Sequence, residues 1–184
     1  TAAVDRAIGE LEGLGAQVEE VRIPALENAT TANMVTMFSE AFAYHEKNLA
    51  RQPEKFGEQV RTPFLMGGLF TAADYIQAQR ARSRLRREYV ETLGNVDVLA
   101  MPTSFAPPST FGEVDTLARL KLPSFTAPLN QAGAPAISVP CGFNKAGLPL
   151  GFQIAGKAFD EATVLRVAHA YEQHARWFER RPQL

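Results

Sequence analysis

The chain has 184 residues, of which 46% are hydrophobic, so it can bury a core and has the size of one domain or of part of a larger one. Its 19 basic and 20 acidic residues give a formal net charge of -1, which argues against nucleic acid as a partner. One cysteine excludes an internal disulfide framework, and the three histidines offer no zinc-binding spacing with it. We therefore expect a cytoplasmic protein with no metal, no cofactor, no signal peptide and no membrane span.

The chain is expected to open with a helix followed by a strand. Residues 1–14 carry apolar side chains on one helical stripe, and Gly15 can end that helix in a left-handed conformation. Residues 17–23 carry Val18, Val21 and Ile23 among charged side chains and stop at Pro24, which predicts a short strand near a sheet edge. Because the chain starts within this helix and without Met, we expect that an upstream part has been removed.

Two long amphipathic helices are predicted in the middle of the chain. Residues 31–50 and 72–93 repeat apolar side chains every three or four residues, and a shorter helix with an irregular turn is expected over 54–70. Thr71 is a good N-cap for the second long helix, and Gly94 supplies its stop.

Two polar residues fall on the apolar stripes of these helices. His45 is interpreted either as a boundary histidine or as a pocket residue, because its position on the stripe says little more. Arg82 lies in the middle of the buried-looking face of the second helix. Its stem can cover apolar surface or its charge can join an internal salt bridge, or the guanidinium can face a ligand carboxylate or carbonyl. The sequence leaves both readings of Arg82 open.

An apolar run at residues 96–101 predicts a strand buried on both faces of a parallel or mixed sheet. The loop over 102–115 is long for a connector and is a candidate binding loop. Thr103 and Ser104 stand at the carboxyl end of the strand, where ligands of open α/β sheets bind. Hydroxyl groups there can also simply cap the turn.

The uncharged run from Leu122 to Asn144 is long enough to cross a bilayer, but its prolines would break a spanning helix. It is interpreted instead as backbone buried in protein. A hairpin is predicted from strands at 136–141 and 151–155, and Asp160 is expected to cap a final amphipathic helix. Helices and strands in this order define an α/β segment.

Motifs that carry catalysis are missing from the chain. It has no Gly-x-Ser-x-Gly elbow, no phosphate-binding glycine loop and no His-Glu-x-x-His. Cys141 is a poor nucleophile candidate, with His45 or His169 as its base, because it lies in an apolar strand with nothing nearby to lower its pKa. No pattern links a serine to a lysine among Ser104, Ser124, Ser138, Lys121 and Lys157. We therefore assign no catalytic residue.

Five separated blocks nevertheless resemble one enzyme family in the same order. They are LGAQVEEVRIP at 14–24, DYIQAQRARSRL at 74–85, DVLAMPTS at 97–104, NQAGAPAISVPCGF at 130–143 and GLPLGFQIAGKAFDEATVLRVAHAYEQ at 147–173. Together they are similar to the carboxyl-terminal part of amidase signature family hydrolases. The resemblance covers nearly all of the chain.

The resemblance implies an α/β/α fold with a large mixed β-sheet flanked by helices. It also implies that residues 1–184 are a single segment, the carboxyl-terminal part of an amidase domain. Family members cleave amides with a serine nucleophile, a second serine in a cis peptide and a lysine, all in the amino-terminal half, and no position here matches them. The isolated chain is expected to be inactive and to contribute sheet scaffold and a pocket wall for a small amide substrate, with Arg82, Thr103 and Ser104 as the substrate-binding candidates.

Two other functions stay open. In the family, the subunit that releases ammonia from glutamine for tRNA-dependent amidation has an arginine at the place of Arg82, but its acidic residue corresponds to a place near Pro123 that is not acidic here. This difference favours a general amidase. The chain can also be a noncatalytic structural or binding module of the same fold. A fragment whose missing half is its partner is expected to expose an apolar docking surface and to self-associate through it, whereas a module is expected to show a polar surface.

Overall fold

The computed structural model describes residues 2–109 and 122–181. The elements are α1 (Ala2–Gly13), η1 (Pro24–Asn28), α2 (Ala29–Arg51), η2 (Pro53–Lys55), α3 (Glu58–Gly67), α4 (Ala72–Leu93), β1 (Val98–Pro102), α6 (Ala127–Ala132), β2 (Ala136–Phe143), β3 (Pro149–Gly156), α7 (Glu161–Ala175) and η3 (Trp177–Glu179). Lys121 and the end of the predicted binding loop, residues 110–115, lie outside the described residues. No helix within the described ranges combines the length and apolar character needed to cross a membrane.

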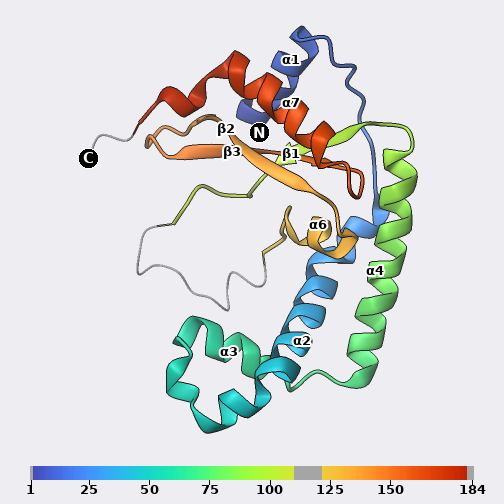
Figure 1. Cartoon of the computed structure of the whole chain (residues 1–184), viewed down its shortest axis with the longest axis vertical. Helices are drawn as coiled ribbons and strands as arrows, with labels where there is room; N and C mark the ends of the chain where they lie inside the picture. Colours follow the sequence, from blue (N-terminus) through green and yellow to red (C-terminus); the bar gives the residue numbers. More distant parts are fainter. Residues whose placement is uncertain (1, 110–121, 182–184) are drawn as a thin grey trace.

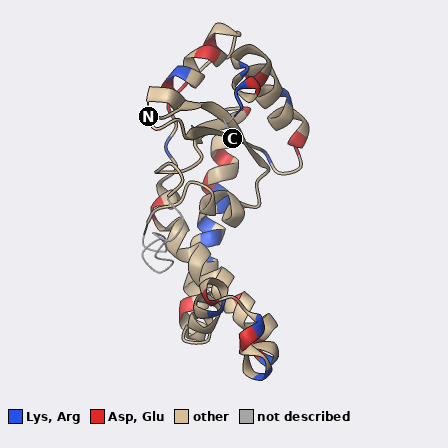
Figure 2. Cartoon of the chain, turned by 90° about the vertical axis from the view of Figure 1, so that its left-hand side faces the viewer, with Lys and Arg blue, Asp and Glu red and all other residues tan. Residues whose placement is uncertain are grey.

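A three-stranded antiparallel sheet lies at the centre, in the order β1-β3-β2 (Figure 1). Its strands carry no charged side chain (Figure 2). Because side chains alternate along a strand, Phe152 and Ile154 of β3 point to one face while Gln153 and Ala155 point to the other. All four are buried, so the central strand is covered on both faces.

Each face of the sheet has its own helical cover (Figure 1). Helices α1 and α7 bury the Phe152 face in one hydrophobic cluster, in which Tyr171 meets Phe152 edge to face with ring centroids 5.2 Å apart. On the opposite side, Leu85, Tyr89 and Leu93 of α4 pack in a second cluster that includes Ala155. Helix α3 lies at the far end of α2 from the sheet (Figure 1). The sheet is thus flanked by helices, as the predicted α/β fold class requires.

Tyr89 ties α4 to the end of the central strand. Its side chain is 4% exposed, and its hydroxyl donates to the carbonyl of Gly156 at 2.9 Å. Burial raises the pKa of Tyr89 to about 12 from an ordinary 10.0. Since the neutral phenol is the form that the fold favours, this contribution to stability is complete below about pH 10 and is lost as the pH rises through about 12.

We expect Tyr89→Phe to lower the free energy of unfolding by about 1 to 3 kcal/mol at neutral pH, because a buried carbonyl loses its donor. The variant should also lose less stability than the native chain between about pH 10 and 12. Urea denaturation followed by circular dichroism at neutral and alkaline pH measures both effects. Tyr44→Phe is the matched control, because the Tyr44 side chain is 82% exposed; equal losses in the two variants would contradict the role of Tyr89.

Most predicted elements are confirmed, several with their caps. Gly15 follows α1 with φ 98°. Thr71 and Asp74 form a capping box at the start of α4, in which the Thr71 N–H donates to Asp74 Oδ2 at 2.8 Å and Thr71 Oγ1 accepts from the Asp74 N–H at 3.2 Å. Asp160 Oδ1 accepts from the Thr163 N–H at the start of α7. These caps satisfy N–H groups that a helix start leaves without partners.

The strand predicted at 17–23 is wrong. The structure has no strand there, and Val18 and Val21 are 48% and 37% exposed. A run of β-branched and charged residues forms a half-buried strand only where a sheet edge is available to pair with it. Within the described chain, this segment pairs with no strand and runs from α1 to η1.

Two features of the sheet differ from expectation. The predicted strand at 96–101 is present as β1, but it pairs antiparallel with β3, and Ala100 is exposed because β1 is an edge strand of the described sheet. The uncharged run contains a short helix, α6, that was not predicted. Pro128 in its first turn and Gly133 at its left-handed end, with φ 72°, are the signals that mark it.

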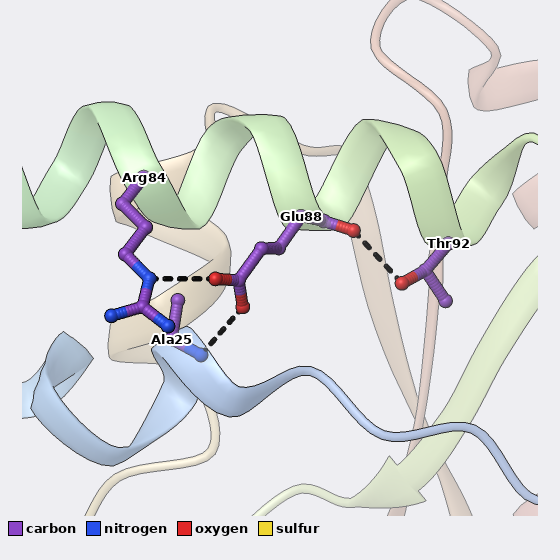
Figure 3. Close-up of polar contacts among 4 residues, drawn as sticks. All are labelled: Ala25, Arg84, Glu88 and Thr92. Carbon is purple, nitrogen blue, oxygen red and sulfur yellow. Dashed lines mark hydrogen bonds and ion pairs between the residues drawn. The ribbon is translucent and has the colours of Figure 1, made fainter.

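Glu88 anchors η1 to α4 (Figure 3). Its Oε2 accepts from the backbone N–H of Ala25 at 2.7 Å, and its Oε1 accepts from Arg84 Nε at 2.7 Å. Its own carbonyl accepts from the Thr92 hydroxyl at 2.8 Å. The Arg84 guanidinium, and next the Ala25 N–H, lower the pKa of Glu88 from its ordinary 4.5. The ionised carboxylate is therefore the form that holds this junction.

A depressed pKa contributes stability that is complete above about pH 4.5 and is lost as the pH falls through the folded-state pKa. We therefore expect Glu88→Gln to lower stability at about pH 6 and to lose less than the native chain on acidification to about pH 3. Urea midpoints at the two pH values measure this. Glu91→Gln on the same helix is the control, because the Glu91 side chain is exposed to solvent. An unchanged acid slope in Glu88→Gln would contradict the role of the carboxylate.

Candidate functional site

A row of polar side chains crosses the sheet on the face opposite Phe152. Ser138 on β2 lies directly opposite Gln153 on β3, and the Thr103 N–H donates to the Gly151 carbonyl at 3.1 Å just beyond the end of β1. The Thr103 and Ser138 hydroxyls are 2.6 Å apart and share a hydrogen bond. Two edge strands thus bring their hydroxyls together across the central strand.

Gly151 allows the Thr103 and Ser138 hydroxyls to lie this close together. It lies on β3 between the two hydroxyls, and a Cβ at this position would lie 2.7 Å from Thr103 Oγ1 and 2.9 Å from Ser138 Oγ. Such approaches are shorter than van der Waals contact, so any side chain here would push the pair apart. Glycine in a strand often marks a close approach of this kind.

The loop after β1 meets the segment before α6 beside this row. The rings of Phe105 and Phe125 stack with centroids 4.1 Å apart, and Phe105 is 55% exposed. The Gln153 side chain donates from Nε2 to the carbonyl of Phe125 at 3.2 Å and is itself 4% exposed. The polar row is therefore bordered by an aromatic pair that the sheet holds in place.

Arg82 points from α4 to the other end of α6. Its side chain is half-buried, and its Nε donates to the carbonyl of Gln131 at 3.1 Å. Its terminal Nη groups make no hydrogen bond to another described residue. No ion pair between Arg82 and a carboxylate is present in the described part of the chain, so the internal salt bridge that was one reading of Arg82 is not seen there. The guanidinium is held by one N–H and keeps donors for a further acceptor.

Gln131 fixes this end of α6 to α2. It is 3% exposed, and its Nε2 donates to Asn33 Oδ1 at 3.2 Å, while Oε1 is buried with no partner among the described residues. The bond from Gln153 to the Phe125 carbonyl holds the segment just before α6 to the sheet. Helix α6 is therefore fixed at both ends, with Arg82 near one end and the polar row near the other.

The three predicted substrate-binding residues differ in their hydrogen-bond partners and in their exposure to solvent. Thr103 pairs with Ser138, which was not predicted as a site residue. Ser104 is exposed, and its hydroxyl accepts from the Ala106 N–H at a long 3.5 Å. This is the bond expected if Ser104 caps the turn after β1. No hydrogen bond joins Arg82 to Thr103 or Ser104 within the described residues. The pairing of Thr103 with Ser138 depends on strand register, for which the sequence gives no signal.

A nucleophile paired with a base is not found in the described part of the chain. Cys141 is 1% exposed, and burial raises the pKa of its thiol, which opposes thiolate formation. His45 packs in an aromatic group, stacked on Phe64 with ring centroids 5.3 Å apart, which is the contact of a packing residue. Within residues 2–109 and 122–181, no group of three metal-binding side chains is close enough to hold an ion.

Fold and site together describe an α/β segment with a row of hydroxyl and amide side chains across its sheet and with no reacting pair among the described residues. The family model named Amidase matches residues 1–165, and the chain belongs to this family.

Similar proteins agree with that family. An amidase of Pseudomonas putida is 37% identical over 99% of this chain, and a glutamyl-tRNA(Gln) amidotransferase subunit of Brevibacillus brevis is 36% identical over 98% of it. A crystal structure of an amidase superposes with a TM-score of 0.82 and 30% identity over 95% of this chain and 41% of that one. The corresponding amidotransferase subunit of Thermotoga maritima superposes with a TM-score of 0.74 and 32% identity over 96% of this chain and 39% of that one.

The chain spans 41% of the Pseudomonas putida amidase and 42% of the Brevibacillus brevis amidotransferase subunit. These matches and the superpositions agree with the fold implied by the five sequence blocks.

Proposed function

We propose that this chain is the carboxyl-terminal part of an amidase that hydrolyses carbon–nitrogen amide bonds. It supplies sheet scaffold and one wall of the substrate pocket, and the serine, cis-serine and lysine that react with the amide lie in the amino-terminal half. The observation that carries the proposal is the Thr103–Ser138 hydroxyl pair, 2.6 Å apart, on the sheet face opposite Phe152 in a chain of the Amidase family. Hydroxyls and a half-buried guanidinium can bind an amide substrate, but cannot by themselves generate a nucleophile.

Arg82 is the second group of the proposed wall. Its free Nη donors suit a carbonyl or carboxylate oxygen of the substrate. Thr103 and Ser104, at the end of β1, are the other contacts, and Ser138 joins them through its bond to Thr103.

The test compares ammonia release from simple amides by the chain alone and by a polypeptide that joins it to an amino-terminal portion carrying the Ser/cis-Ser/Lys set. We expect activity only in the joined polypeptide. Activity in the short chain would refute the division of roles, and a joined, folded polypeptide without activity would favour a noncatalytic module of the same fold. Binding of a hydrophobic dye by the short chain, lost on joining, would show the expected docking surface.

A second candidate is the glutamine-hydrolysing subunit of a tRNA-dependent amidotransferase. It is favoured by the 36% identity to the Brevibacillus brevis amidotransferase subunit. The absence of an acidic residue near Pro123 opposes it. Hydrolysis of simple amides but not of glutamine by the joined polypeptide would exclude this candidate.

A further inference from the structure

Phe105, in the loop after β1, has a ring that is exposed to solvent and yet packed against another ring. Phe105, Phe159 and Phe178 are 55%, 96% and 38% exposed. Within the described part of the chain, neither Phe159 nor Phe178 packs against another ring. The ring of Phe105 stacks on that of Phe125, with centroids 4.1 Å apart and 15° between the planes. The stacked pair therefore presents an apolar surface in one orientation, with room for a ligand on its exposed side.

The backbone around Phe125 is held by three hydrogen bonds to different elements. Gln153, which is buried in β3, donates from Nε2 to the Phe125 carbonyl at 3.2 Å. The Ser124 N–H donates to Thr30 Oγ1 on α2 at 3.1 Å. The Ser124 hydroxyl accepts from the Ala127 N–H in the first turn of α6 at 3.0 Å. The supporting ring is therefore positioned by the sheet, α2 and α6 before any ligand binds.

The aromatic pair lies beside the polar row of the sheet. Phe105 follows two residues after Thr103, whose hydroxyl shares a hydrogen bond with that of Ser138. Gln153, which holds the Phe125 carbonyl, lies directly opposite Ser138 in the sheet. Ser138 is itself exposed. Hydrogen-bonding groups and an exposed apolar surface therefore adjoin each other on this part of the chain.

This combination fits an amide that carries a flat apolar group. Hydroxyl groups can bind both the oxygen and the N–H of an amide. A phenylalanine ring gains most from a second ring in offset-stacked or edge-to-face contact. A ring that is already fixed also loses less entropy on binding than a mobile one. A small aliphatic amide such as acetamide has no group that can cover the ring.

We propose that Phe105 is a specificity-determining residue that selects amides with an aromatic group, such as benzamide, over small aliphatic amides. The inference rests on the proposed function, because it names the substrate class of the same pocket wall. The aromatic group of the substrate packs on the exposed side of the Phe105 ring, and Phe125 supports that ring from its other side.

Kinetics of the joined polypeptide with benzamide and acetamide test the inference. We expect a higher kcat/KM for benzamide, and Phe105→Ala should lower the benzamide-to-acetamide ratio of kcat/KM about five- to tenfold, mainly through KM for benzamide. Phe105→Tyr keeps the ring and should keep most of the ratio. Phe159→Ala removes an exposed ring outside the proposed wall and should leave the ratio unchanged. An unchanged ratio in Phe105→Ala, or an equal loss for both amides, would overturn the inference.

A binding measurement separates failure of this inference from failure of the proposed function. Saturation-transfer NMR detects bound benzamide without turnover, so it also applies to a folded joined polypeptide that hydrolyses neither amide. Benzamide binding that is lost in Phe105→Ala and kept in Phe105→Tyr would support the aromatic contact even where hydrolysis had failed. Benzamide binding that is absent, or equal in Phe105→Ala and the native sequence, would overturn it.

Discussion

Arg82→Ala should lower kcat/KM about tenfold or more in the polypeptide that joins this chain to a catalytic amino-terminal portion. A hydrogen bond to a charged group contributes about 1.5 to 3 kcal/mol, and about 1.4 kcal/mol corresponds to a factor of ten. Because the guanidinium is proposed to contact the substrate rather than the reacting atoms, most of the loss should appear in KM. Steady-state kinetics with one amide substrate measures the two constants.

Two further variants separate binding from packing. Arg82 also donates to the Gln131 carbonyl, so its removal is expected to cost some stability. Arg82→Lys keeps the charge but not the planar fork, and should recover little of the lost kcat/KM if two oxygens are bound. Arg80→Ala, on the exposed side of α4, should leave the kinetics unchanged. Unchanged kinetics in Arg82→Ala with reduced stability would mean that Arg82 is purely structural.

Phe152→Ala should lower the free energy of unfolding by about 3 to 5 kcal/mol, the largest effect that we expect from one core substitution. Phe152 is 0% exposed on the central strand and meets Tyr171 edge to face at 5.2 Å. Its removal leaves a cavity between β3 and α7 that the two elements cannot close without moving. Equilibrium urea denaturation of residues 1–184 measures the loss.

Phe159→Ala is the matched control for this substitution. Phe159 lies in the turn between β3 and α7 and is 96% exposed, so its removal should change stability by no more than about 0.5 kcal/mol. If Phe152→Ala were no more harmful than Phe159→Ala, the central strand would not be the core of the chain. If Phe152→Ala did not fold at all, Phe152→Leu, which keeps most of the buried area, should restore folding.

Helices could be predicted well because their signals are local. The stripe of α4 and its Thr71–Asp74 cap are encoded within a few residues, as is the stop at Gly15. The hairpin of β2 and β3 could also be predicted, since Asn144 and Gly147 mark its turn. In each case, the sequence neighbours that identify the element are also its structural partners.

Strand partners and the site were harder to predict from the sequence because they depend on contacts between distant residues. Residues 17–23 have the β-branched residues of a strand but no sheet edge to pair with among the described residues. Strand β1 has an antiparallel partner that lies far along the chain. The Thr103–Ser138 pair requires both the register of three strands and the missing side chain of Gly151. No pattern in the sequence indicates the strand register or the close approach at Gly151. The family resemblance indicated Arg82, but not its bond to Gln131.

Labelling with a fluorophosphonate, which reacts with activated serines, tests most directly whether the reacting atoms lie outside this chain. We predict that residues 1–184 alone are not labelled, and that the joined polypeptide is labelled on a serine of its amino-terminal portion, as located by peptide mass spectrometry. Ser104 and Ser138 should stay unmodified in both. Labelling of either serine in the short chain would contradict the proposal that this chain provides the pocket wall and not the nucleophile.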